Sequence, residues 1–328
     1  MREFRTIELR EALSLRKIAD SGQCFRPGEI GDGVFRFISG SEVLELRQCG
    51  DCAVEVSCDA ETWERVWLPY FDLERDYSAI QRDIFESGDT LLAEATIHGD
   101  GIRVLRQEPF EMLVSFVLSQ RKSIPAIRTA VRGLAETYGE AISAPSGETV
   151  FLFPKPEALA GSSEESLRNL GLGYRAPYVL DAARRVADGR LDLDAVRDLP
   201  DEELFAELQS VHGVGKKVAN CVMLFGYGRT ERVPSDVWMQ RIVSEGYQGV
   251  DPLIARKHAG ILQQYLFYYA LTHKERFIPR KARDENRKEK KGEMNHATRT
   301  ETKTDGGHRL YQADPSGKAQ PARTAEAL

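Results

Sequence analysis

The sequence predicts an α+β fold, in which a small antiparallel β domain precedes a mostly helical body. Within residues 34–57, short apolar runs alternate with glycine-containing turns, and this spacing is typical of an antiparallel meander. From about residue 77 onward, the apolar residues recur with the period of helices instead. The chain has 328 residues, of which 41% are hydrophobic and 29% are charged. This length suffices for two or three units with buried cores.

The β domain is expected to occupy residues 1–76. We predict a short helix over 9–18, a turn or strand start over 21–28, and strands over 34–38, 43–47 and 53–57. An aromatic-rich run over 63–71 closes this part of the chain. Large aromatic side chains are more often core than ligand site, so we assign that run to the core of the β domain.

The helical body is expected to occupy residues 77–279 as two subdomains that flank a cleft. Apolar periodicity predicts helices over 79–87, 90–97, 109–119, 124–138, 156–160, 164–170, 175–188, 201–209 and 256–271. The helix that begins at Pro109 is apolar nearly throughout, which favours a central buried helix. Residues 280–328 contain few apolar side chains and are predicted to form a disordered, mildly basic tail.

The charge is distributed unevenly along the chain. The formal net charge is −6 at pH 7, but residues 278–328 hold 12 Lys and Arg against 8 Asp and Glu. The remaining chain therefore holds 33 basic residues against 43 acidic ones. Because the overall field of the body repels nucleic acid, any DNA binding there must rely on a local patch or on backbone amides.

The cysteines and the N-terminus bear on location and cofactors. The first residues lack the apolar run of a signal peptide, and no stretch has the roughly 20 apolar residues of a membrane span. We expect a cytoplasmic protein without a membrane partner, associated with the nucleoid if its source is bacterial; a nuclear location stays open. An odd count of five cysteines indicates free thiols. Cys49, Cys52 and Cys58 lack a fourth ligand at metal-finger spacing, and no cysteine follows Cys221 for an iron–sulfur cluster. We therefore expect neither metal nor organic cofactor.

A glycine hairpin between two helices is the most informative stretch. Residues 211–221 read Val-His-Gly-Val-Gly-Lys-Lys-Val-Ala-Asn-Cys, so a polar helix ends, turns on Gly213 and Gly215, and a new helix opens with two lysines. Amides in such a turn and in the first turn of a helix lack partners, and the helix dipole adds positive potential. The hairpin thus predicts a phosphate site that needs no basic surface. Taken alone, the pattern also fits a purely structural hairpin.

Helical spacing separates the two lysines. The predicted buried stripe of the second helix consists of Val214, Val218, Val222 and Phe225. Lys217 is four residues from Cys221 and shares a face with it beside this stripe, whereas Lys216 lies further toward solvent. An amine held against apolar surface loses its proton more readily and becomes a nucleophile and Schiff-base former. Lys217 is therefore the candidate nucleophile, and Lys216 a solvated or phosphate-facing charge.

Asp236 follows Pro234 and Ser235 at the predicted start of another helix. Aspartate is a good helix N-cap, and we expect that role here. Backbone amides fix such a carboxylate in place, where it can stabilise a cationic sugar transition state. A lysine nucleophile and a fixed aspartate together suit the displacement of a base from deoxyribose.

The hairpin and the run Val-Pro-Ser-Asp-Val over residues 233–237 resemble the helix–hairpin–helix signature of DNA glycosylases. More narrowly, residues 5–277 resemble the 8-oxoguanine DNA glycosylase/AP lyase family. The runs 21–26 (Ser-Gly-Gln-Cys-Phe-Arg), 105–116 and 170–176 are similar to segments of that family. The resemblance implies a TBP-like N-terminal β domain packed on a helical HhH-GPD glycosylase body.

The resemblance also implies a function. The protein would remove 8-oxoguanine opposite cytosine through a lysine Schiff base and then cut the strand by β-elimination. Its partner would be double-stranded DNA containing oxidised guanine, and we expect a monomer. Each implied residue role has a bland alternative in core packing, turns or surface polarity. The implied roles are Lys217 as nucleophile, Asp236 as catalytic carboxylate, Gly22, Cys221, Gln263 and Phe267 as base contacts, and Tyr174 and Arg175 as contacts to the opposite strand or the unpaired cytosine.

Three positions depart from the family pattern. Arg121 stands where the family often has a gap-filling asparagine, Ala126 aligns with a family arginine, and Trp238 replaces a phosphate-contacting histidine. Recognition of the opposite cytosine and one phosphate contact must therefore differ from those of the family. Two alternatives stay open: an alkylated-purine glycosylase of the same superfamily, which would use the aspartate without a lysine, and a non-catalytic DNA-binding hairpin protein.

Overall fold

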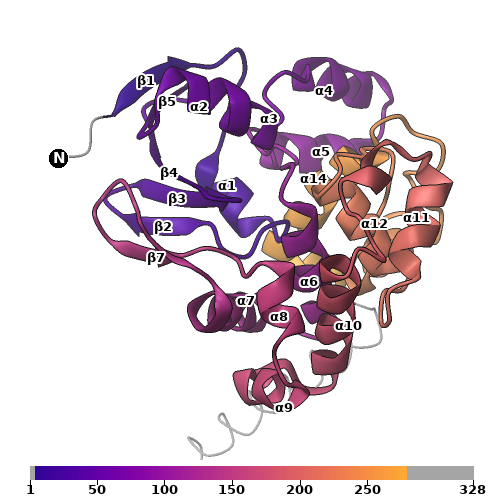
Figure 1. Cartoon of the computed structure of the whole chain (residues 1–328). Helices are drawn as coiled ribbons and strands as arrows, with labels where there is room; N and C mark the ends of the chain where they lie inside the picture. The colour runs from indigo at the N-terminus through magenta and orange to yellow at the C-terminus, as the bar shows by residue number, and fades with distance from the viewer. Residues whose placement is uncertain (1–3, 279–328) are drawn as a thin grey trace, which may run out of the picture. The chain divides into compact units, whose positions relative to one another are not determined.

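The computed structural model describes residues 4–278. Its N-terminal part contains a five-stranded antiparallel sheet with strand order β1-β5-β4-β3-β2 (Figure 1). The strands are β1 (Arg5–Glu8), β2 (Gly28–Gly31), β3 (Val34–Ser39), β4 (Glu42–Gln48) and β5 (Ala53–Val56). The three strands predicted from the sequence are confirmed, and β1 and β2 complete the sheet. A separate hairpin, β6 (Ala141–Ser143) and β7 (Thr149–Phe151), was not predicted.

The helix predicted over residues 9–18 is wrong in its first half. Helix α1 (Leu15–Asp20) begins at the N-cap Ser14, and residues 9–13 run along the sheet instead. There the amide of Leu9 bonds to the carbonyl of Cys52 at 2.8 Å, and that of Leu13 to Asp51 at 2.9 Å. These backbone hydrogen bonds, made to residues about 40 positions away, outweigh the local helical periodicity.

The body that follows is helical. Its main helices match the predicted ones within a few residues, except that α9 stops at Leu167 before a π-helical turn. Helix α14 starts three residues late, because His258 has a left-handed backbone with φ of 55°. The α-helices that follow α1 in the chain are α2 (Ala60–Thr62), α3 (Leu68–Tyr70), α4 (Tyr77–Glu86), α5 (Thr90–His98), α6 (Pro109–Leu118), α7 (Ile124–Tyr138), α8 (Pro156–Ala160), α9 (Glu164–Leu167), α10 (Ala176–Ala187), α11 (Asp201–Gln209), α12 (Lys216–Phe225), α13 (Val237–Arg241) and α14 (Ala259–Thr272), of which α2 and α3 precede the helical body.

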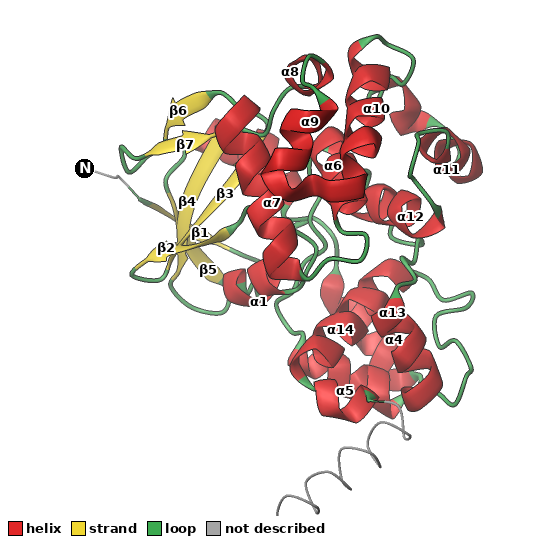
Figure 2. Ribbon diagram, turned by 90° about the horizontal axis from the view of Figure 1, so that it is seen from below, coloured by secondary structure: helices red, strands yellow, loops and turns green. Residues whose placement is uncertain are grey.

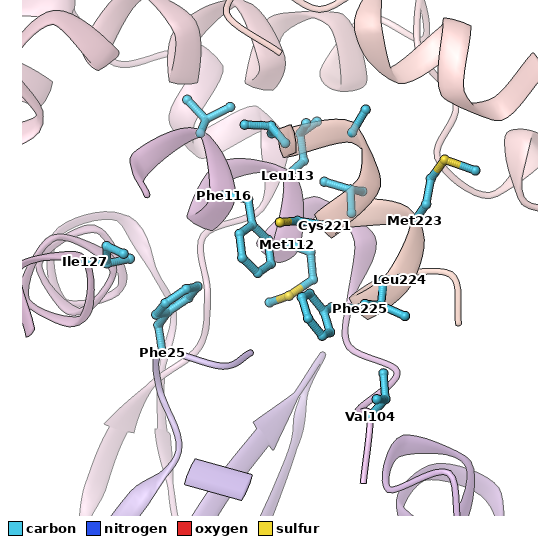
Figure 3. Packing of buried hydrophobic residues seen from close by; sticks show 14 of the residues in the cluster. Phe25, Val104, Met112, Leu113, Phe116, Ile127, Cys221, Met223, Leu224 and Phe225 are labelled. Carbon is cyan, nitrogen blue, oxygen red and sulfur yellow. The ribbon is translucent and has the colours of Figure 1, made fainter. Parts of the chain in front are cut away.

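Two hydrophobic cores lie within residues 4–278. The smaller joins the inner face of the sheet to α1 and to the aromatic run around Trp67 and Phe71. The larger lies among the helices, which stand beside the sheet in Figure 2. Nine of the ten residues of α6 are buried in it, which confirms the predicted central helix. Phe25 comes from the N-terminal part yet packs edge-on against Phe116 of α6, with ring centroids 5.4 Å apart (Figure 3).

The predicted domain boundaries at residues 76 and 279 stay predictions. The tail predicted for residues 280–328 lies outside the described residues. Within the described part of the chain, no helix has the length and apolar character needed to cross a membrane.

Candidate active site

The glycine hairpin joins α11 to α12. Gly213 has φ of 83°, and a Cβ atom there would lie 2.4 Å from the ring of Tyr178. Both the backbone conformation and the neighbouring ring therefore require glycine. Gly215 occupies the N-cap position of α12 with open space around it. The hairpin thus brings backbone close to the surface without a side chain in the way.

The amides of this hairpin are available for an external partner. The amide of His212 is taken up by the carboxylate of Asp181 at 2.9 Å. Those of Gly213, Gly215 and Lys216 have no acceptor among residues 4–278. They stand at the N-terminus of a ten-residue helix, where the helix dipole adds positive potential. The geometry is that of an anion site.

Lys217 lies in the first turn of α12 and is half-buried. Its Nζ donates to Ser119 Oγ at 3.0 Å and stands 5.0 Å from the centroid of the Phe116 ring. The predicted buried stripe beside it is confirmed, since all four of its members are buried. The amine is therefore held between a hydroxyl and an aromatic face on α6, whereas Lys216 is exposed.

Cys221 lies beside Lys217 one turn further along α12, and Figure 3 shows its sulfur close to the ring of Phe116. The cysteine is 2% exposed. Burial raises the pKa of the Cys221 thiol to about 11, although the charge of Lys217 and a hydrogen bond from it act in the opposite direction. The thiol therefore stays protonated at neutral pH, and in that form it is a poor nucleophile.

Asp236 caps α13, as the sequence predicts. Its Oδ1 accepts from the amides of Trp238 at 2.9 Å and Met239 at 3.0 Å. The other carboxylate oxygen has no hydrogen-bond donor in the described part of the chain. The two amides therefore hold this half-buried carboxylate at a fixed place.

One cavity of about 360 Å³ brings Lys217 and Asp236 together, whereas Cys221 is not among its lining residues. Lys217 and Asp236 line it with Gly22 and Phe267, so four distant segments of the chain contribute to one cavity. Its further lining residues are Phe25, Phe116, Ser119, Lys122, Ser123, Ile124, Pro125, Ile127, Trp238, Leu271 and Lys274. Gln263 is 4% exposed and lies one turn before Phe267 on α14. Its Oε1 is buried without a hydrogen-bond partner among the described residues.

Gly22 lies where the N-terminal part packs against Phe267 of α14. It has φ of 77°, and a Cβ atom there would lie 2.9 Å from Phe267 Cε1 and 3.2 Å from Ile124 Cδ1. The adjacent carbonyl of Ser21 accepts from the side-chain amide of Gln264 at 2.7 Å. Backbone from the start of the chain is therefore pressed against the ring of Phe267, and only glycine fits there.

The turn between α6 and α7 carries Arg121, which is exposed and has a left-handed backbone with φ of 53°. Arg175 is 6% exposed, and its Nε donates to the carbonyl of Gln120 at 2.8 Å. Tyr174 is 44% exposed, with the Arg175 guanidinium 4.3 Å from its ring centroid. The structure thus leaves Tyr174 and Arg121 open to solvent, whereas Arg175 supports the turn. Ala126, half-buried in the first turn of α7, supplies no polar group.

Several lining residues had no role assigned from the sequence. Lys122 donates to the carbonyl of Gly171 at 2.9 Å, and burial together with the charge of Arg175 lowers the pKa of its ammonium group. Lys274 and Ser119 also line the cavity. These residues meet Lys217 only through tertiary packing, so no local pattern signals them. Among residues 4–278, no group of three His, Cys, Asp or Glu side chains could hold a metal ion.

Two family models match the chain. The 8-oxoguanine DNA glycosylase N-terminal domain matches residues 6–113, and the HhH-GPD superfamily base excision DNA repair protein matches residues 114–253. The N-glycosylase/DNA lyase of Saccharomyces cerevisiae is 31% identical over 219 residues, which cover 63% of this chain and 56% of the yeast protein. This chain therefore spans little more than half of that relative.

Solved structures extend the comparison. The 8-oxoguanine glycosylase/lyase of Clostridium acetobutylicum, in complex with duplex DNA containing cytosine opposite to 8-oxoguanine, is 32% identical with a TM-score of 0.74. The match covers 84% of this chain and all of that one. A structure of MBOgg1 in complex with a low-affinity DNA ligand is 34% identical with a TM-score of 0.76 over 83% of this chain and 99% of that one.

The sheet, the helical body and the glycine hairpin, together with these matches, define a base-excision DNA repair protein of the helix–hairpin–helix superfamily. Within that superfamily, the chain belongs to the 8-oxoguanine DNA glycosylase/DNA lyase family. The predicted fold class and the resemblance found in the sequence are both confirmed.

Proposed function

We propose that this protein excises 8-oxoguanine from duplex DNA through a Schiff base on Lys217 and then cuts the strand by β-elimination. One observation carries the proposal: Lys217 and Asp236 line the same cavity as the Gly22–Phe267 contact. A nucleophilic amine, a fixed carboxylate and an aromatic wall suit the removal of a base from a sugar through a Schiff base. The names of the relatives support the same activity.

The target bond is inaccessible inside a stacked duplex, so the damaged nucleotide rotates out into the cavity. The lone pair of Lys217 Nζ forms a bond to C1′ of the sugar while the electron pair of the glycosidic bond leaves with the base. The proton lost by the nitrogen goes to the departing base. Asp236 stabilises the positive charge that develops on the sugar in the transition state.

Strand cutting follows from the covalent intermediate. The sugar ring opens to give an imine between C1′ and Lys217, which acidifies the hydrogen on C2′. Loss of that proton expels the 3′ phosphate, and the strand is cut 3′ to the lesion. Hydrolysis of the imine then frees Lys217 for another turnover.

Base recognition is assigned to residues in and beside the cavity. Oxidised guanine carries a proton on N7 that guanine lacks, and the carbonyl of Gly22 is the proposed acceptor. Phe267 would stack on the base, and the neutral Cys221 would cover its other face. Gln263 would hydrogen-bond the base edge, and its buried, unpartnered Oε1 supports this role, since such groups are normally satisfied.

DNA is proposed to bind through the backbone amides of the hairpin. The free amides of Gly213 and Gly215, with Lys216 beside them, would bind a phosphate near the lesion. Arg121 and Tyr174 would face the opposite strand and its cytosine. Arg175 is proposed to assist them by holding the turn that carries Arg121.

Borohydride trapping on duplex DNA containing 8-oxoguanine tests the mechanism. The wild-type protein should form a covalent complex, and Lys217→Gln should form none, because an amide side chain makes no imine. Lys216→Gln is the matched control: it should bind DNA more weakly but still be trapped at saturating duplex. Trapping that survives Lys217→Gln would rule out the assigned nucleophile.

A cleavage panel tests the substrate. Duplexes with 8-oxoguanine opposite each of the four bases, and duplexes with alkylated purines, should show cutting of 8-oxoguanine opposite cytosine first. Preferential release of alkylated purines without strand cutting would contradict the proposal.

A further inference from the structure

We propose that Ser119 is the positioning residue for the nucleophile, holding Lys217 Nζ in place for attack while leaving its lone pair free. This inference rests on the proposed function, because it concerns the efficiency of the same covalent step. Ser119 is the C-cap residue of α6, lies 98 residues before Lys217 in the chain, and lines the same cavity.

The hydroxyl of Ser119 has a single proton, and this fixes the direction of its hydrogen bonds. Ser119 Oγ lies 2.7 Å from the carbonyl oxygen of Phe116, which can only accept, so the hydroxyl proton is committed there. Toward Lys217 Nζ, at 3.0 Å, the same oxygen can then only accept. A hydroxyl free to rotate would also donate to a neutral amine and would occupy the lone pair that must attack. The Phe116 carbonyl prevents this competition.

The acceptor is itself held rigidly. The amide of Ser119 bonds to the carbonyl of Ser115 at 3.0 Å, and its carbonyl accepts from the amide of Lys122 at 3.2 Å. Helix α6 is the buried central helix, so this anchor does not shift with solvent-exposed loops. The ring of Phe116, 5.0 Å from the amine, is fixed by the same helix.

A lysine side chain has several rotatable bonds, and each rotamer places its amine elsewhere. Attack at C1′ needs a near-attack geometry, and a misplacement of about 1 Å can cost about a hundredfold in rate. With Ser119 as acceptor and Phe116 as wall, one rotamer is selected before substrate arrives. The effect belongs to the chemical step and leaves contacts to the duplex unchanged.

The test uses the full-length chain with Ser119→Ala and Ser119→Thr. We measure the single-turnover rate of borohydride-trappable complex at saturating duplex, and separately the dissociation constant. Ser119→Ala should slow trapping by about tenfold with unchanged affinity, and Ser119→Thr, which keeps the hydroxyl, should restore most of the rate. Ser115→Ala is the matched control, since the hydroxyl of this buried serine on the same helix has no hydrogen-bond partner within residues 4–278.

The outcomes separate the two proposals. If the wild-type protein forms no trapped complex, the proposed function itself fails. If the wild type is trapped and Ser119→Ala is trapped equally fast, the positioning role is wrong while the mechanism stands. A slow Ser119→Ala that Ser119→Thr does not restore, or an equally slow Ser115→Ala, would show a packing defect and would also overturn the inference.

Discussion

At the scale of single residues, the lack of a side chain at Gly22 determines how closely the backbone approaches Phe267 at the cavity. Its left-handed backbone and its contact with Phe267 are both needed to close one wall of the cavity. The sequence suggested a functional glycine only through resemblance, because a turn glycine and a base-contacting glycine look alike in one chain. The structure gives a physical reason for glycine that holds whatever the role of its carbonyl.

Gly22→Ala should lower the free energy of unfolding by about 1–3 kcal/mol, through left-handed strain and the 2.9 Å approach to Phe267. It should also slow excision, because the ring of Phe267 must move. Urea unfolding and single-turnover cleavage measure the two effects. Gly28→Ala is the control: its Cβ would meet nothing within 4 Å, and its φ is not left-handed. Equal behaviour of the two variants would contradict this account.

At the scale of elements, the sequence predicted those features that depend on residues close together in the chain. The helices, the buried stripe of α12 and the shared face of Lys217 and Cys221 follow from spacing alone. The error in the first half of the helix predicted over residues 9–18 and the missed strand β1 both arise from pairing with distant residues of the sheet. The Ser119–Lys217 bond was missed for the same reason, since 98 residues separate its partners.

The carboxylate of Glu11, which lies in the N-terminal segment, accepts hydrogen bonds from the first turn of helix α4. Glu11 accepts from the amides of Tyr77 at 3.2 Å and Ser78 at 2.8 Å, and from Arg103 at 2.8 Å. Burial alone would raise the pKa of Glu11, but the hydrogen bonds from Ser78 and the hydrogen bond and charge of Arg103 outweigh it and lower the pKa to about 2. The carboxylate therefore joins the N-terminal segment to the helical body.

Glu11→Gln should cost about 1–2 kcal/mol of unfolding free energy at pH 7 after allowance for solvent screening. Because the pKa of Glu11 is lowered from 4.5 to about 2 in the folded state, this stabilisation is complete above pH 4.5 and lost as the pH falls toward 2. The difference between wild type and variant should therefore shrink over that window in urea unfolding. Glu8→Gln, at an exposed position of β1, is the control and should show no such trend. A gap that stays constant down to pH 2 would contradict the assignment.

At the scale of the whole molecule, a body with a net negative charge is proposed to bind DNA, which is also negatively charged. The 33 basic and 43 acidic residues outside the C-terminal segment give a repulsive overall field. The cavity is an exception, since Lys122, Lys217 and Lys274 line it with Asp236 as the one acidic lining residue. Local cations and free amides at the hairpin therefore offset the charge of the surface around them.

Deleting residues 279–328 removes 12 basic and 8 acidic residues. The truncated chain should bind duplex DNA more weakly at low salt. The slope of log affinity against log salt should become shallower by about one to four, because fewer phosphates are neutralised. The single-turnover rate at saturating duplex should not change, since no residue of the cavity is lost. A reduced rate at saturation would show that the segment contributes to catalysis.

The contact between Gly22 and Phe267 also sets an order of events during biosynthesis. A nascent chain that has emerged only as far as Asp236 already carries the hairpin and both proposed catalytic groups, but it lacks α14 and hence the aromatic wall. Gln264 of that helix is also what holds the carbonyl of Ser21. The amine of Lys217 and an incomplete pocket thus coexist on the ribosome until α14 is released. The pocket is completed only when the two ends of the fold meet.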